Sequence, residues 1–320
     1  MTARPSAAPA ALLTLLLLAA CGPEPGGVPG QAEAPVGAEA AEDGPRAIYE
    51  RHLVFVSRSR DSSLAVPLMF RTTSSPATVR NEVRGWLARG GEWDPFFLDA
   101  WTTGPRRSPW RILPRGPLRL VVGPGDALER VAFSQGAREL ELVPGEVLAD
   151  WAGPRGEAVR VHEADLTLSS RRVAGWLLDM ARGWTEPNPG PGDLVILTSG
   201  DSLQVVMEAE TETTSAEIPT PWRGWARMDF EDRLWDRVST QWSGVRTFEP
   251  ARRQIPAGWT LATGDSTLVG TLTVTSSDLA AGAGEGPMRP VEAVFEVEGI
   301  LRLFDREFPV QGVLRHSQRF

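Results

Sequence analysis

The 320-residue sequence predicts a mainly β fold made of two tandem β-barrel halves, which are related by internal duplication and carry one short helix each. Apolar side chains alternate with other side chains along residues 64–71, which is the period of a β-strand. Turn sequences rich in Gly, Asp and Ser recur between such segments. Two stretches far apart in the chain also resemble each other, which indicates duplication.

The first 45 residues are expected to lie outside the folded part. Residues 1–20 carry an apolar segment that is too short to span a bilayer and is typical of a secretion signal. The Leu-Ala-Ala-Cys sequence that ends at Cys21 resembles the lipobox of bacterial lipoproteins, which implies cleavage before Cys21 and lipid attachment to it. An ordinary secretion signal with an incidental cysteine is the alternative.

The segment that follows predicts both a tether and a location. Residues 21–45 are rich in Gly, Pro and acidic side chains, and they should form a disordered spacer. By resemblance to the sorting rule of Gram-negative lipoproteins, Gly22 implies anchoring in the outer membrane, facing the periplasm. Several acyl chains on one residue suffice for stable anchoring, so the membrane is an expected partner.

The composition excludes several classes of protein. The single cysteine rules out an internal disulfide framework, and with only three histidines we expect no metal site and no cofactor. The net charge is −8, and no run of Lys or Arg is present. Nucleic acid is therefore not an expected partner.

The repeat divides the folded part into residues 46–188 and 189–320. Residues 157–171 align without a gap with 292–306, and after a gain of two residues 173–182 match 310–319. A helix is predicted in each half, over residues 75–87 and 229–238. The expected apolar stripes are Val79, Val83, Trp86 and Leu87 in one helix and Phe230, Leu234, Trp235 and Val238 in the other.

Two tandem β units that end in long V-x-G hairpins are similar to the AttH and carotenoid hydratase (hydroxyneurosporene synthase) family. The hairpin ends are residues 175–184 and 312–320, whereas the aromatic stretch of the family is absent from residues 47–55. The resemblance implies a lipocalin-like fold for each half. It also implies a hydratase- or isomerase-like activity as one possible function.

Four residues are candidates for ligand binding or catalysis. Arg160 and His162 fall on the predicted inner face of the first half, where the second half has Phe and Val. They could bind an anionic group or line a wet cavity, or they could be structural residues paired with an acid such as Asp179. Asp179 and His316 are taken as equivalent positions that could transfer protons. His52 is expected at the surface.

Tryptophans gather at corresponding places in both halves. They are either core residues or walls of an apolar pocket. The wall candidates are Trp86, Trp93, Trp101, Trp222, Trp225 and Trp235. The Gly-Asp-Ser-Leu string at 200–203 resembles a serine esterase motif, but a strand-like segment follows it, so we expect a hairpin turn.

Three functions are compatible with these observations. We favour a lipid-anchored envelope protein that binds a lipophilic or anionic small molecule in a lipocalin-like cavity. The alternatives are an enzyme of the AttH or carotenoid hydratase type, using His316, Asp179 or His162, and a structural lipoprotein of envelope assembly. The sequence leaves enzymatic activity open and leans toward binding.

Overall fold

The computed structural model describes residues 46–59, 63–104, 115–153, 155–186, 190, 192–212, 216–282 and 286–319. The predicted signal, the tether and Cys21 lie outside these residues. Residues 42–320 form one compact unit. Among the described residues, no helix has the length and apolar character needed to cross a membrane.

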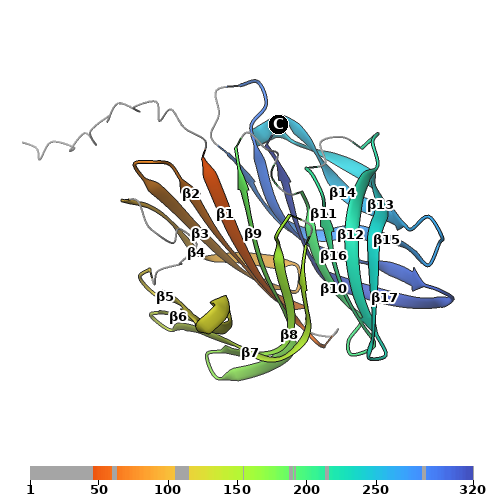
Figure 1. Cartoon of the computed structure of the whole chain (residues 1–320), viewed down its shortest axis with the longest axis horizontal. Helices are drawn as coiled ribbons and strands as arrows, with labels where there is room; N and C mark the ends of the chain where they lie inside the picture. Colours follow the sequence, from red (N-terminus) through yellow and green to blue (C-terminus); the bar gives the residue numbers. More distant parts are fainter. Residues whose placement is uncertain are drawn as a thin grey trace, which may run out of the picture. The chain divides into compact units, whose positions relative to one another are not determined.

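The predicted tandem β architecture is confirmed (Figure 1). The first half is a nine-stranded, barrel-like antiparallel sheet in the order β4-β3-β2-β1-β9-β8-β7-β6-β5. Its strands are β1 (Ala47–Ser57), β2 (Leu64–Ser74), β3 (Val79–Arg89), β4 (Glu92–Thr103), β5 (Leu118–Val122), β6 (Leu128–Gln135), β7 (Arg138–Ala152), β8 (Ala158–Leu168) and β9 (Arg171–Thr185).

The second half is a closed barrel of eight antiparallel strands. Its strands are β10 (Leu194–Thr198), β11 (Leu203–Ala209), β12 (Thr220–Met228), β13 (Glu231–Phe248), β14 (Arg253–Ala262), β15 (Leu268–Ala281), β16 (Val291–Leu303) and β17 (Arg306–Gln318). The Gly-Asp-Ser-Leu string lies at the turn between β10 and β11, as expected for a hairpin.

The prediction of one helix in each half is wrong. Residues 79–89 and 231–248 are strands, and the described residues hold only two single 3₁₀ turns, Pro124–Asp126 and Glu249–Ala251. A spacing of four residues does not distinguish the two structures, because positions i and i+4 share a face in a strand as well as in a helix. Trp86 is not part of this stripe, because it faces away from Val83 and Leu87 and packs against Val294 of the second half.

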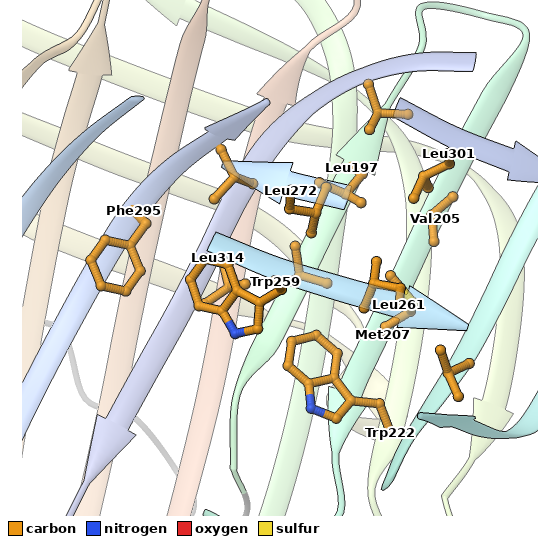
Figure 2. Close-up of a cluster of buried hydrophobic side chains, with 14 of the residues drawn as sticks. Leu197, Val205, Met207, Trp222, Trp259, Leu261, Leu272, Phe295, Leu301 and Leu314 are labelled. Atoms are coloured by element: carbon orange, nitrogen blue, oxygen red, sulfur yellow. The ribbon is translucent and has the colours of Figure 1, made fainter. Parts of the chain in front are cut away.

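The interior of the closed barrel is filled by large side chains. Figure 2 shows Trp222, Trp259 and Phe295 among leucines that come from several strands, and all three aromatic side chains are fully buried. Trp259 and Phe295 contact each other edge to face, with ring centroids 5.8 Å apart. The inward face of β16 is therefore core, as the alternation along this strand predicted.

The two halves pack through the outer faces of their sheets. Strands at this contact are buried on both faces, and all residues of β10 and β11 are buried. One end of the contact is an apolar cluster that includes Val54, Leu178 and Ile196. The other end is charged, and we call it the inter-barrel charge cluster; it consists of Glu50, Arg71, Arg182, Glu292, Arg315 and Arg319.

Candidate functional site

A polar cavity lies on the inner face of the nine-stranded sheet, and we call it the sheet cavity. Its volume is about 350 Å³, within the range of pockets that hold small molecules. Its polar lining residues include Tyr49, Arg51, Arg160 and Asp179. Small residues from β8 and β9, among them Ala158, Ala181 and Gly183, leave the space open.

A buried ion pair forms one wall of the sheet cavity. The guanidinium of Arg51 donates to both carboxylate oxygens of Asp179, from Nε over 2.8 Å and from Nη2 over 2.7 Å. Nη2 also donates to the backbone carbonyl of Asp126 over 2.9 Å. Burial alone would lower the pKa of Arg51, but the hydrogen bond and charge of Asp179 outweigh it and raise this pKa. The hydrogen bonds therefore hold the two side chains in a fixed position.

Strand alternation places these side chains. Along β1, the side chains of Leu53 and Phe55 belong to the apolar interior of the sheet, and Tyr49 and Arg51 continue the same face. Asp179 is paired in register with Arg160 of β8 and lies on the inner face of β9. The interior thus changes from apolar to polar toward one end of the sheet.

Two groups of the sheet cavity have hydrogen-bonding capacity for a ligand. Arg160 uses its Nε in a 3.1 Å contact with Asp150, whose side chain is 55% exposed, so this pair is weak. Tyr49 is the only tyrosine of the chain. Burial raises its pKa to about 12, although the charge of Arg51 opposes this shift, so its hydroxyl stays neutral and can donate a hydrogen bond.

His162 lies deeper on the same strand face as Arg160. It is 5% exposed, and neither ring nitrogen has a hydrogen-bond partner of normal geometry, although the Gly145 backbone is close enough to favour the protonated ring. Burial lowers the pKa of His162, and the charge of Asp179 offsets part of that effect. The ring is therefore neutral near pH 7.

The structure brings together some of the predicted site residues. Arg160 and Asp179 line one cavity, and His162 is close enough to feel the charge of Asp179. His316 lies in the closed barrel, where its Nδ1 is 2.7 Å from Asp193 and its ring contacts Trp242 and Phe295. His316 is therefore separate from the sheet cavity.

The expected equivalence of Asp179 and His316 is wrong. Both final hairpins have two-residue turns and unbroken registers, so there is no place for a gain of two residues. Arg160 pairs with Asp179 in the first half, and Phe295 pairs with Leu314 in the second. Along the hairpin, Asp179 thus corresponds to Leu314, and His316 corresponds to Ala181.

The expectation that His52 lies at the surface is also wrong. His52 is 2% exposed, faces the closed barrel, and has its Nε2 3.1 Å from Glu50. Burial, together with the charge of Arg182, lowers the pKa of His52 to about 3. The side chains of β1 alternate between the two faces of the sheet, but the face that points away from the sheet interior is covered by the second half.

Glu50 is the centre of the inter-barrel charge cluster. It is fully buried and contacts Arg71 and Arg182 of the first half and Arg319 of the second. Burial alone would raise the pKa of Glu50, but the arginine charges lower it well below its usual value. This cluster fixes the contact between the halves by charge pairing that leaves Glu50 fully compensated.

An apolar pocket of about 30 Å³ lies beside this cluster, with room for about one or two water molecules. His52, Met69 and Trp86 line it from the first half, and Val294 and Arg315 line it from the second. We call it the inter-barrel pocket. Two nitrogens of Arg315, Nε and Nη1, are buried without a hydrogen-bond partner.

The tryptophans that were predicted as pocket walls lie in several different environments. Trp86 lines the inter-barrel pocket and donates to Asp278 over 2.6 Å. Trp93 donates to Ser276, and Trp101 lies beneath Arg115 with 5.1 Å between the guanidinium and the ring. Trp222 is core. Trp225 and Trp235 line a further pocket between the halves.

Sequence reasoning missed Tyr49 and Arg51 as cavity residues. The sequence contains the pattern that would have identified them, because Tyr49 and Arg51 lie at alternate positions with Leu53 and Phe55 and therefore share their face of the strand. It also missed Glu50, whose arginine partners come from residues far away in the chain. Among the described residues, no group of three or more His, Cys, Asp or Glu side chains is arranged to hold a metal ion.

Comparison with known proteins gives structural neighbours only. No protein-family model matches the sequence, and no curated protein matches it. Kievitone hydratase from Nectria haematococca superposes with a TM-score of 0.52 at 10% identity, over 84% of this chain and 87% of that chain. An AttH-like protein from Nitrosomonas europaea superposes with a TM-score of 0.51 at 13% identity, over 90% of this chain and 97% of that chain.

A third structure, CghA with Sch210972, gives a TM-score of 0.50 at 12% identity, over 86% of this chain and 88% of that chain. At these identities the likeness concerns the fold alone. The AttH-like fold expected from the sequence is therefore confirmed.

Proposed function

We propose that the protein binds a small organic anion in the sheet cavity. The observation that carries this proposal is the 350 Å³ space in which Arg160 and the neutral hydroxyl of Tyr49 meet a fixed Arg51–Asp179 pair. A ligand carboxylate can replace the half-exposed Asp150 as the partner of Arg160 at little cost.

The packing of the two halves favours an anionic ligand over a lipophilic one. The described side chains of the closed barrel fill its interior, and the apolar end of the nine-stranded sheet is likewise buried core. The open space is at the polar end of the sheet. A compact ligand with a charged group fits this space better than a long hydrocarbon chain does.

Calorimetric titration with succinate tests the proposal, with neutral succinamide as the comparison ligand. We expect succinate to bind and Arg160→Gln to weaken it by about tenfold or more, because a charge-assisted hydrogen bond is lost. Arg172→Gln is the matched control, since Arg172 pairs with Asp165 at the surface of the same sheet. Equal binding of succinate and succinamide, or equal effects of both variants, would contradict the proposal.

A second candidate function is a hydratase-like reaction, and the likeness in fold to kievitone hydratase supports it. Incubation with an acyclic carotenoid in ¹⁸O-labelled water tests this candidate, and the absence of a labelled product would exclude it.

We also propose that Cys21 carries lipid and anchors the protein in the outer membrane, facing the periplasm. The lipobox-like segment and Gly22 support this proposal. Metabolic labelling with an alkyne fatty acid should mark the wild type and leave Cys21→Ser unmarked. Labelling of Cys21→Ser to the same extent would contradict it.

A further inference from the structure

A second pocket lies between the outer faces of the two halves, beside two stacked tryptophans. Trp151 of β7 and Trp225 of β12 have ring centroids 5.6 Å apart and an angle of 25° between their planes. The cavity that they line has a volume of about 190 Å³, and we call it the Trp151 pocket. Aromatic walls of this kind favour cations and apolar groups.

A buried carboxylate without a full set of partners lines the same pocket. Glu208 of β11 is 8% exposed, and its Oε2 has no hydrogen-bond partner. Burial raises the pKa of Glu208, the charge of Arg182 opposes this shift, and Glu157 adds to it. A buried carboxylate that lacks a hydrogen-bond partner for one oxygen is costly to ionise.

The charges around the pocket leave negative charge uncompensated. Arg155 pairs with Glu157, and Arg223 pairs with Glu210, so these four side chains neutralise one another. Arg182 is engaged by Glu50 on the side of the inter-barrel charge cluster. Asp236 of β13 also lines the pocket and has no ion-pair partner among the described residues.

We propose that the Trp151 pocket binds a small organic ammonium ion, with Glu208 and Asp236 as counter-charges and the tryptophan rings as walls. The cation would supply the partner that Glu208 lacks, and its alkyl groups would contact Trp151 and Trp225. The site is independent of the sheet cavity, because none of the residues that line one pocket lines the other.

Calorimetric titration of the full-length protein with choline tests the proposal. The comparison ligand is 3,3-dimethyl-1-butanol, in which carbon replaces the charged nitrogen. We expect choline to bind about tenfold more tightly than the alcohol, which corresponds to about 1.4 kcal/mol. Equal affinity for both ligands would overturn the proposal, since the charge would then contribute nothing.

Variants distinguish choline binding in the Trp151 pocket from a general attraction of choline to the negative charge of the protein. Glu208→Gln preserves the shape of the side chain and should weaken choline binding by about tenfold, and Asp236→Asn should weaken it by a smaller factor. Glu307→Gln is the control, because Glu307 is exposed and absent from the pocket lining. If Glu208→Gln does not fold, Asp236→Asn and Trp151→Leu still test the site, and full affinity in both would overturn the proposal.

The pH dependence supplies an independent measurement. Because burial raises the pKa of Glu208 despite Arg182, Arg155 and Arg223, choline must displace a proton at low pH. Choline binding should therefore strengthen as the pH rises through the titration of Glu208 in the wild type, and Glu208→Gln should flatten this dependence. A dependence of the same size in Glu208→Gln would contradict the role given to Glu208.

Discussion

The two halves share a final hairpin of the same register but differ in what fills their interiors. Where the closed barrel has Phe295 and Leu314, the nine-stranded sheet has Arg160 and Asp179. His316 of the closed barrel corresponds to Ala181 of the sheet along the same hairpin. Large apolar side chains therefore fill the interior of the closed barrel. Charged and small side chains at equivalent positions leave a cavity in the nine-stranded sheet.

The largest expected effect comes from opening the filled interior. Trp259→Ala should lower the free energy of unfolding by about 3–5 kcal/mol, because the fully buried indole leaves a cavity that the closed barrel cannot collapse. Urea denaturation measures this change. Trp101→Ala in the sheet is the matched variant, and since Trp101 is half-buried it should cost at most about 2 kcal/mol. Equal losses would mean that the interiors do not differ in packing.

Breaking the ion pair of the sheet cavity should have the next largest effect. Asp179→Asn leaves the buried charge of Arg51 without its partner and should cost about 3 kcal/mol of unfolding free energy. Asp165→Asn removes the exposed pair with Arg172 and should change denaturation little. If both variants denature alike, the Arg51–Asp179 pair is not the fixed wall described above.

The buried histidines should make the protein sensitive to acid. The pKa of His52 is about 3 in the folded chain, against 6.5 for an ordinary histidine, so below pH 6.5 the unfolded chain binds more protons and the folded state loses stability. His52 should account for about 2 kcal/mol at pH 5 relative to pH 7. The lowered pKa of His162 acts in the same direction.

Urea denaturation at pH 7 and pH 5 checks this expectation. His52→Gln should reduce the difference in unfolding free energy between the two pH values, and His162→Gln should reduce it by a smaller amount. An unchanged difference in His52→Gln would contradict the burial of a neutral ring at the contact between the halves.

The smallest expected effect concerns the hairpin turns, where the halves agree. Ser169 and Phe304 begin equivalent turns and have φ of 54° and 55°, a conformation that bulky side chains disfavour. Phe304→Asn should raise the free energy of unfolding by about 0.5–1 kcal/mol, and Ser169→Asn by less. A loss of stability in Phe304→Asn would show that contacts of the ring outweigh the backbone strain.

The sequence allowed the β architecture and the inward face of β16 to be predicted, because each depends on alternation along a strand. The possible ion pair of Arg160 with Asp179 is not formed, because Arg160 contacts Asp150 and Asp179 is bound by Arg51. Helices were predicted wrongly because apolar spacings of four residues fit a strand equally well. His52 was placed wrongly because its face is covered by a sheet from the other half, and this contact leaves no local pattern. Residues 194–198 are buried on both faces and show no alternation at all.

Succinate titration of Arg160→Phe tests the central claim most directly. This variant gives the sheet the residue that fills the closed barrel at the equivalent position, and it places a ring in the sheet cavity. We predict that succinate binding is lost while the free energy of unfolding stays within about 1 kcal/mol of the wild type. Succinate binding to Arg160→Phe with the affinity of the wild type would contradict the assignment of the sheet cavity as the ligand site.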